Sequence, residues 1–228
     1  MKAKTLCLLA GTAVPLILTG SVQAEFTGLS TFSKPNEFGL LVVNVYAEFD
    51  RPGDLMQTVG GTASTPLVVT VENGTFYNHS FGSVTNASPN AALIDAFPSL
   101  AFDSFVSIGA KFSSAAFPDE TTLFGLPPIA GSVFSSTGSG WGVTPLDPQG
   151  DPFNTDYSSG NGQILIGQFA TIDGTAIHGM MAIHVVSNDA VRQLAVSFYH
   201  VPGPSALWLL GAAGLLGSRR RYARGAAP

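Results

Sequence analysis

Three aspartates in a proline-rich stretch have the side chains best suited to hold a cation. They are Asp147, Asp151 and Asp156, within the run Asp-Pro-Gln-Gly-Asp-Pro-Phe-Asn-Thr-Asp. A hard cation such as calcium takes several carboxylate and carbonyl oxygens from an adaptable loop. The run lacks the spacing of an EF-hand loop, so two interpretations stay open. Either it binds calcium, or its aspartates are solvated turn residues. No other cofactor is expected.

Three aromatic side chains lie in or beside expected loops, where their rings could stack on sugars. They are Tyr77, Trp141 and Tyr157. Aromatic rings at the rim of a β-sandwich can bind carbohydrate, and they can equally close the ends of the hydrophobic core. The first interpretation predicts a carbohydrate-binding module.

The remaining polar residues form no convergent catalytic set. Glu48 and Asp50 share one face of an expected strand, about 7 Å apart, as a glycosidase pair would need; acids exposed at a strand end are the plainer interpretation. His178 and His184 share a strand face but lie about 20 Å apart, too far to chelate one metal. We therefore expect no enzymatic activity, and a secreted hydrolase is the less favoured alternative.

The segment that must position these residues, 25–200, has the composition of an all-β domain. Runs rich in Val, Ile, Phe and Thr are separated by Gly, Pro, Asn and Ser, and no long segment has the helical period. Alternation of apolar and polar residues, clearest from Val43 onward, predicts a half-buried strand over Leu41–Phe49. Further strands are expected at 66–72, 75–81, 102–112, 132–134, 140–143, 163–172, 178–187 and 192–200, with a short helix ending at Ala96. We expect a two-sheet sandwich of about seven to ten strands, with jelly-roll and immunoglobulin-like topologies both open.

The charge of this domain is strongly negative. All fifteen acidic residues of the chain lie within it, but only four of the ten basic ones do, which gives a net charge of −11 against −5 for the whole chain. Such a body argues against nucleic acid and against direct binding to anionic lipid. The only cysteine, Cys7, lies outside it, so the domain contains no disulfide.

Residues 1–24 have the three parts of a secretory signal peptide. Lys2 and Lys4 precede an apolar run over 6–18, and Val22 and Ala24 place small residues at the positions that signal peptidase recognises. We expect export through the Sec translocon and cleavage after Ala24; an uncleaved anchor is the alternative.

The tail, residues 201–228, combines an extended entry, a short apolar run and a basic cluster. Pro202 and Pro204 disfavour helix at the entry, and the apolar run over 205–218 follows. As a helix this run reaches roughly 21 Å, less than the roughly 30 Å hydrocarbon core of a bilayer. The arginines within 219–224 should remain cytoplasmic. We expect a transient anchor in the inner membrane.

The tail resembles the PEP-CTERM sorting signal of Gram-negative bacteria over Val201 to Arg221, about one tenth of the chain. The motif residues are Val201, Pro202, Gly203, Pro204, Arg219, Arg220 and Arg221. The resemblance implies recognition by an integral-membrane exosortase, cleavage near the prolines and transfer to the cell surface, often alongside exopolysaccharide. Gly203 departs from the family's usual glutamate. An anchor that is never cleaved is the alternative.

The body is similar to central regions of other secreted PEP-CTERM proteins. The residues that carry this similarity lie at 44–50, 97–109, 140–141 and 165–169. Those regions bring no catalytic residues with them. Together these resemblances imply an exported, non-enzymatic protein of the cell envelope or extracellular matrix.

Overall fold

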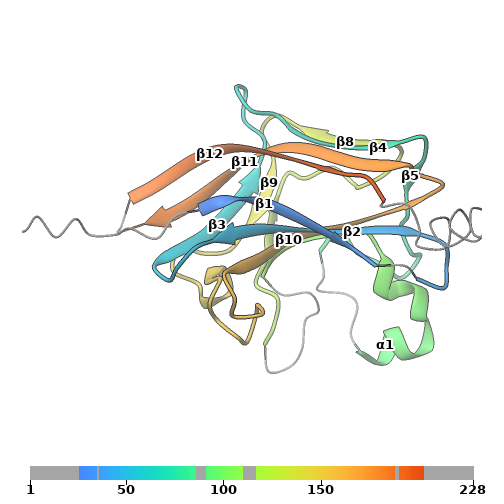
Figure 1. Ribbon diagram of the computed structural model, residues 1–228, viewed down its shortest axis with the longest axis horizontal. Coiled ribbons are helices and arrows are strands. Elements are labelled where there is room, and N and C mark those ends of the chain that lie inside the picture. The colour runs from blue at the N-terminus through green and yellow to red at the C-terminus, as the bar shows by residue number, and fades with distance from the viewer. Residues whose placement is uncertain (1–25, 35, 86–90, 110–116, 188–189, 203–228) are drawn as a thin grey trace, which may run out of the picture.

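The computed structural model describes residues 26–34, 36–85, 91–109, 117–187 and 190–202. The described residues are mostly β-strand and form two antiparallel sheets, which confirms the all-β class (Figure 1). The expected signal peptide and membrane helix lie outside the described residues. The same holds for the motif residues Val22, Ala24, Gly203, Pro204, Arg219, Arg220 and Arg221.

Sheet A is built around β10 (Gln163–Ile172). One edge of β10 pairs with β2 (Leu41–Phe49), which in turn pairs with β1 (Phe26–Ser33). β5 (Thr75–Phe76) and β6 (Phe105–Gly109) pair with different parts of β10. α1 (Ala91–Ala96) and the 3₁₀ turn η1 (Pro98–Phe102) precede β6, and α1 lies below the sheet A strands in Figure 1.

Sheet B is built around β11 (Ala176–Ser187). β12 (Ala190–His200) pairs with its whole length, while β4 (Leu67–Glu72) and β3 (Asp54–Gly60) pair with its first and second halves. β8 (Val133–Ser136) extends the sheet beyond β4, and β9 (Gly140–Gly142) with β7 (Thr122–Phe124) extend it beyond β3. A second 3₁₀ turn, η2 (Pro148–Gly150), leads into the loop before β10.

The core lies between the two sheets, and β2 shows how the sequence places it there. Val43, Val45, Ala47 and Phe49 are all at most 5% exposed, whereas Asn44, Tyr46 and Glu48 between them are half-buried. Successive side chains of a strand point to opposite faces, so the apolar set must face sheet B. The expected half-buried strand over Leu41–Phe49 is confirmed with the same bounds.

His200 connects the edges of the two sheets. Its Nε2 lies 2.8 Å from the hydroxyl of Ser33 and its Nδ1 lies 3.0 Å from the hydroxyl of Thr31, so β12 is linked to β1 through side chains. Burial lowers the pKa of His200, which favours the neutral ring. A neutral imidazole carries one donor and one acceptor, and hydroxyls can satisfy both.

Several expected boundaries were wrong, each for a local reason. The strand expected over 102–112 begins only at Phe105, because Pro98 starts the 3₁₀ turn before it. The strand expected over 75–81 ends at Phe76. β1, β3 and β7 were not expected, so the described residues hold more strands than the seven to ten foreseen. The pairing of β3 with β11 shifts register between Met56 and Thr58. This bulge interrupts the alternation of buried and exposed side chains by which β3 could have been predicted from the sequence.

Candidate functional site

The face of sheet A that points away from sheet B carries an array of polar and aromatic side chains, here called the outer face. Asn44, Tyr46 and Glu48 of β2 form its centre. On β1, Phe32 lies opposite Asn44 and Ser30 lies opposite Tyr46. On β10, Gln168 pairs with Asn44 and Gln163 pairs with Glu48. Cross-strand partners share a face, so three strands hold these groups in fixed register.

A cavity of about 220 Å³ lies on this face, and we call it the Gln168 cavity. Its lining combines aromatic, cationic and amide side chains: Phe32, Lys34, Asn44, Tyr46, Phe102 and Gln168, beside Val42. Gln168 is fully buried, and its amide nitrogen donates to the carbonyls of Ala101 (3.0 Å) and Asp103 (2.8 Å). Those two bonds fix which end of the amide is nitrogen. Its Oε1 accepts no hydrogen bond from any residue that the structure describes.

Asn44 presents a second acceptor in the same cavity. Its Oδ1 is buried and has no partner in the described part of the chain. Beside it, burial raises the pKa of the Tyr46 hydroxyl, and a hydrogen bond with Asn44 opposes that rise. Buried acceptors without donors are rare in folded proteins, because each costs about 1–3 kcal/mol. Two of them on the lining of one cavity indicate a place for an external donor.

Phe32 and Lys34 bring an apolar ring and a positive charge to the cavity. The Phe32 side chain is 51% exposed, and the Lys34 ammonium lies 5.5 Å from the centre of its ring. That ring is the only partner recorded for this ammonium within the described ranges. An aromatic ring and a cation therefore adjoin the two unpaired acceptors.

A larger cavity of about 400 Å³, the Tyr157 cavity, shares Tyr46 with the first. Tyr157, Asn161 and Gln163 also line it, and the Tyr157 ring packs edge-to-face on Phe117 at 5.8 Å. Partial burial and then the nearby charges of Asp147, Glu120 and Asp156 raise the pKa of Tyr157. The two cavities are thus consecutive hollows along one sheet face, with Tyr46 between them.

Of the three predicted stacking aromatics, one lies at a cavity. Tyr157 lines the larger cavity, as just described. Trp141 was wrongly assigned: it is 0% exposed, and its Nε1 donates to the carbonyl of Ser107 at 2.9 Å. It is a core residue, which is the alternative that the sequence left open. Tyr77 is half-buried and lines neither cavity.

The three predicted calcium ligands do not form a ready-made site. Asp147 accepts the Gln149 amide at 2.9 Å and so caps η2, and Asp151 accepts the Phe153 amide at 2.9 Å. Asp156 is exposed. In the part of the chain that the structure describes, no three His, Cys, Asp or Glu side chains gather closely enough to hold a metal ion. Calcium binding here stays a prediction from the sequence.

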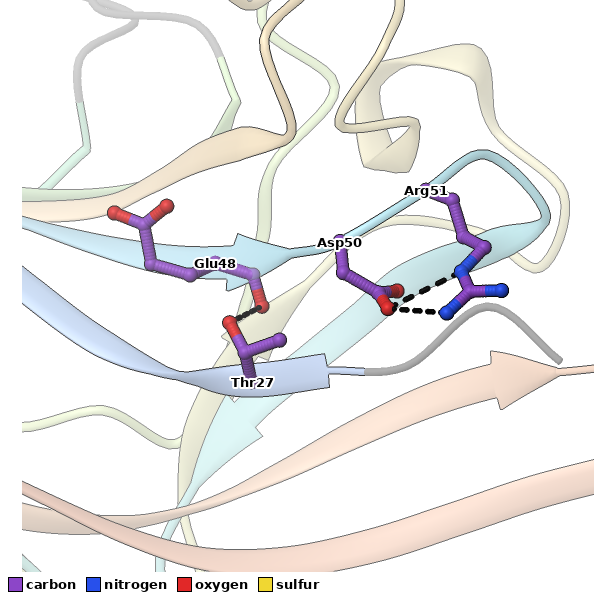
Figure 2. A network of polar contacts seen from close by, with 4 residues as sticks. All are labelled: Thr27, Glu48, Asp50 and Arg51. Carbon is purple, nitrogen blue, oxygen red and sulfur yellow. Dashed lines mark hydrogen bonds and ion pairs between the residues drawn. The ribbon is translucent and has the colours of Figure 1, made fainter. Parts of the chain in front are cut away.

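The acids Glu48 and Asp50 do not face each other (Figure 2). The Glu48 carboxylate accepts the hydroxyl of Ser30 and the amide of Gln163, whereas Asp50 pairs with Arg51 at 2.8 Å. Figure 2 shows the two carboxylates pointing in different directions from β2. This geometry is unlike that of two carboxyls flanking a glycosidic bond.

The two strand histidines likewise serve different neighbours. His178 lies 3.5 Å from the Glu72 carboxylate, and the Nδ1 of His184 lies 2.8 Å from the hydroxyl of Thr58. Each ring therefore has its own cross-strand partner on sheet B.

Only the first two residues of the predicted sorting motif are described. Val201 and Pro202 follow β12 directly and are exposed. In the described ranges, the helices are all too short or too polar to cross a membrane.

The sequence predictions missed Lys34, Asn44, Tyr46 and Gln168 as site residues. The polar half of the alternation in β2 was the available signal, because it placed Asn44, Tyr46 and Glu48 on one face. Lys34 and Gln168 had no such signal: Gln168 comes to that face by pairing with Asn44, and Lys34 lines the cavity from the residue after β1.

Comparisons of the chain with models of protein families, with curated proteins and with solved structures find no match.

Proposed function

We propose that this chain is a non-enzymatic protein of the cell envelope or extracellular matrix, and that its sandwich domain binds polysaccharide. The observation that carries the binding role is the outer face of sheet A, where Tyr46 separates two cavities lined by aromatic, amide and hydroxyl groups. Carbohydrate sites combine aromatic rings, which contact the C–H faces of sugars, with amides that exchange hydrogen bonds with hydroxyls. Successive cavities on a rigid sheet suit successive units of a polymer.

The proposed route is export through the Sec translocon, removal of the signal peptide, transient anchoring and processing by an exosortase. It rests on the signal-peptide pattern of residues 1–24 and on the resemblance of the tail to the PEP-CTERM signal. A body with a net charge of −11 supports solubility outside the cell and disfavours attachment to nucleic acid.

Affinity electrophoresis tests the binding role. The full chain, expressed with its export signals in a Gram-negative host, is run through gels that contain that host's exopolysaccharide. We expect retardation, and we expect Tyr46→Ala to weaken it by about three- to tenfold, as the loss of one aromatic contact implies. Tyr199→Ala is the matched control, because Tyr199 is 60% exposed on the other sheet.

Two outcomes would contradict the proposal. If both tyrosine substitutions weaken binding equally, the polysaccharide does not bind at the outer face. If the wild type migrates without retardation, it does not bind this polysaccharide, and the proposed binding role is wrong. A colorimetric assay for new reducing ends addresses the hydrolase alternative. Sugar release above a boiled control would show that the protein is an enzyme.

A further inference from the structure

The unpaired acceptors restrict the chemistry of a ligand in the Gln168 cavity. The Oε1 of Gln168 and the Oδ1 of Asn44 are buried carbonyl-type oxygens, so a ligand must offer O–H or N–H donors to them. A sugar hydroxyl is one such donor, and it can form the hydrogen bond that each acceptor lacks among the described residues. A site built to bond a hydroxyl strongly rejects analogues that lack it.

The position of Lys34 adds a requirement that a neutral sugar does not meet. Its ammonium has three donors and no acceptor, and it adjoins the exposed Phe32 ring at the cavity wall. The domain has only four basic residues against fifteen acidic ones, so a cation beside a cavity is uncommon in this protein. A carboxylate on the ligand would give this ammonium a charged partner.

The size of the cavity limits the ligand to one ring. About 220 Å³ lies below the roughly 300–1,000 Å³ of pockets for drug-sized molecules. One monosaccharide unit fits this volume, with its neighbour along the polymer directed over Tyr46 toward the larger cavity.

We infer that the Gln168 cavity selects an acidic sugar, a hexuronate unit of a polysaccharide. Its hydroxyls donate to Gln168 and Asn44, its C–H face contacts Phe32, and its carboxylate accepts from Lys34. This inference rests on the proposed function, because it names the sugar class that the outer face binds.

The test compares an acidic polymer with a neutral one. Affinity electrophoresis of the full exported chain in polygalacturonate and in dextran gives two dissociation constants for each variant. We expect the wild type to prefer polygalacturonate. Lys34→Gln should weaken polygalacturonate binding by about two- to fivefold, as for an exposed ion pair, and leave dextran binding unchanged. Added salt should reduce the same preference.

Arg192→Gln is the matched control, since it removes one positive charge from the exposed start of β12 on sheet B. Both substitutions make the net charge more negative by one unit. The loss of binding in Arg192→Gln therefore measures the added long-range repulsion between the acidic protein and the acidic polymer, without the loss of a contact at the cavity. Asn44→Ala should weaken binding to both polymers, because both offer hydroxyl donors. Thermal melting of each variant shows that it is folded.

The outcomes separate this inference from the proposed function. If Lys34→Gln and Arg192→Gln reduce polygalacturonate binding equally, or if the wild type prefers dextran, the acidic-sugar inference is wrong while polysaccharide binding stands. If the wild type binds neither these polymers nor the host's exopolysaccharide, both are wrong.

Discussion

At the scale of single residues, Asp103 is a buried carboxyl with a raised pKa. It is 1% exposed, and burial raises its pKa from 3.8 to about 6, although the amide of His79 donates to it at 2.7 Å. A Cβ added at Gly82 would lie 1.8 Å from its carboxylate, so the loop closes tightly over it. The carbonyl of Asp103 also holds the amide of Gln168. That contact is made by the main chain, whereas Asp103 itself lines a different cavity, together with His79 and Gly82.

The raised pKa predicts a specific pH dependence of stability. Between pH 3.8 and about 6 the unfolded chain loses the Asp103 proton before the folded chain does, so this group's stabilising contribution falls as the pH rises. We expect the free energy of unfolding of Asp103→Asn, measured with urea, to fall less over that range than that of the wild type. Parallel curves for the two proteins would contradict this assignment.

His200 acts in the opposite direction and provides the comparison. Its pKa is lowered from 6.5, so its contribution is present above that pH and is lost as the pH falls below it. A His200→Gln variant should therefore flatten the acid side of the stability profile, whereas Asp103→Asn removes the decline toward neutral pH.

At the scale of elements, β9 shows how a short strand is specified by close approach. Its sequence is Gly-Trp-Gly, and a Cβ at Gly140 would lie 2.2 Å from the carbonyl oxygen of Val59 in β3. The missing side chain lets the two backbones meet. It also lets the ring of Trp141 enter the core, where it is fully buried.

This arrangement predicts unequal effects of two neighbouring glycine substitutions. Gly140→Ala must displace a backbone atom, and we expect it to destabilise the protein by about 1–3 kcal/mol, as overpacking does. Gly138→Ala is the matched control, because nothing lies within 4 Å of its added Cβ. Urea unfolding monitored by tryptophan fluorescence measures both. Similar midpoints for the two variants would show that β9 is not closely packed on β3.

At the scale of the whole molecule, the predicted C-terminal processing site follows β12 of sheet B, whose last residue contacts β1 of sheet A. Val201 and Pro202 leave β12 at the edge of sheet B and are exposed, while both cavities lie on sheet A. The residues that line both cavities all precede Val201, so cleavage near the prolines would leave them in the chain.

Mass spectrometry of the mature termini tests the export route. We expect the protein recovered from the envelope or medium to begin at Glu25 and, in a strain with an active exosortase, to end near Pro202. The same chain from a strain without exosortase should retain residues 205–228. If the tail is identical in both strains, the proposal of exosortase processing is wrong. If the mature protein still begins at residue 1, the N-terminal segment is an uncleaved anchor.

The sequence by itself determined the class of the fold and much of its strand layout. The alternation in β2 and the apolar run of β10 are local patterns, and both strands have the expected bounds. Local patterns failed to predict strands that are specified mainly by their pairing with other strands. Bulged β3 lost its alternation, and the edge strand β1 has no strongly buried face.

Only the tertiary structure decided which of these residues form a site. For Trp141, in the strand expected over 140–143, the sequence left sugar stacking and core packing both open, and the structure shows that its ring is buried. Asn44 and Gln168 are far apart in sequence and meet because β2 pairs with β10, while Lys34 reaches the same cavity from the residue after β1. The sequence of a strand determines which of its faces is apolar. Which side chains of adjacent strands lie beside its polar face depends on pairing between residues that are distant in the sequence.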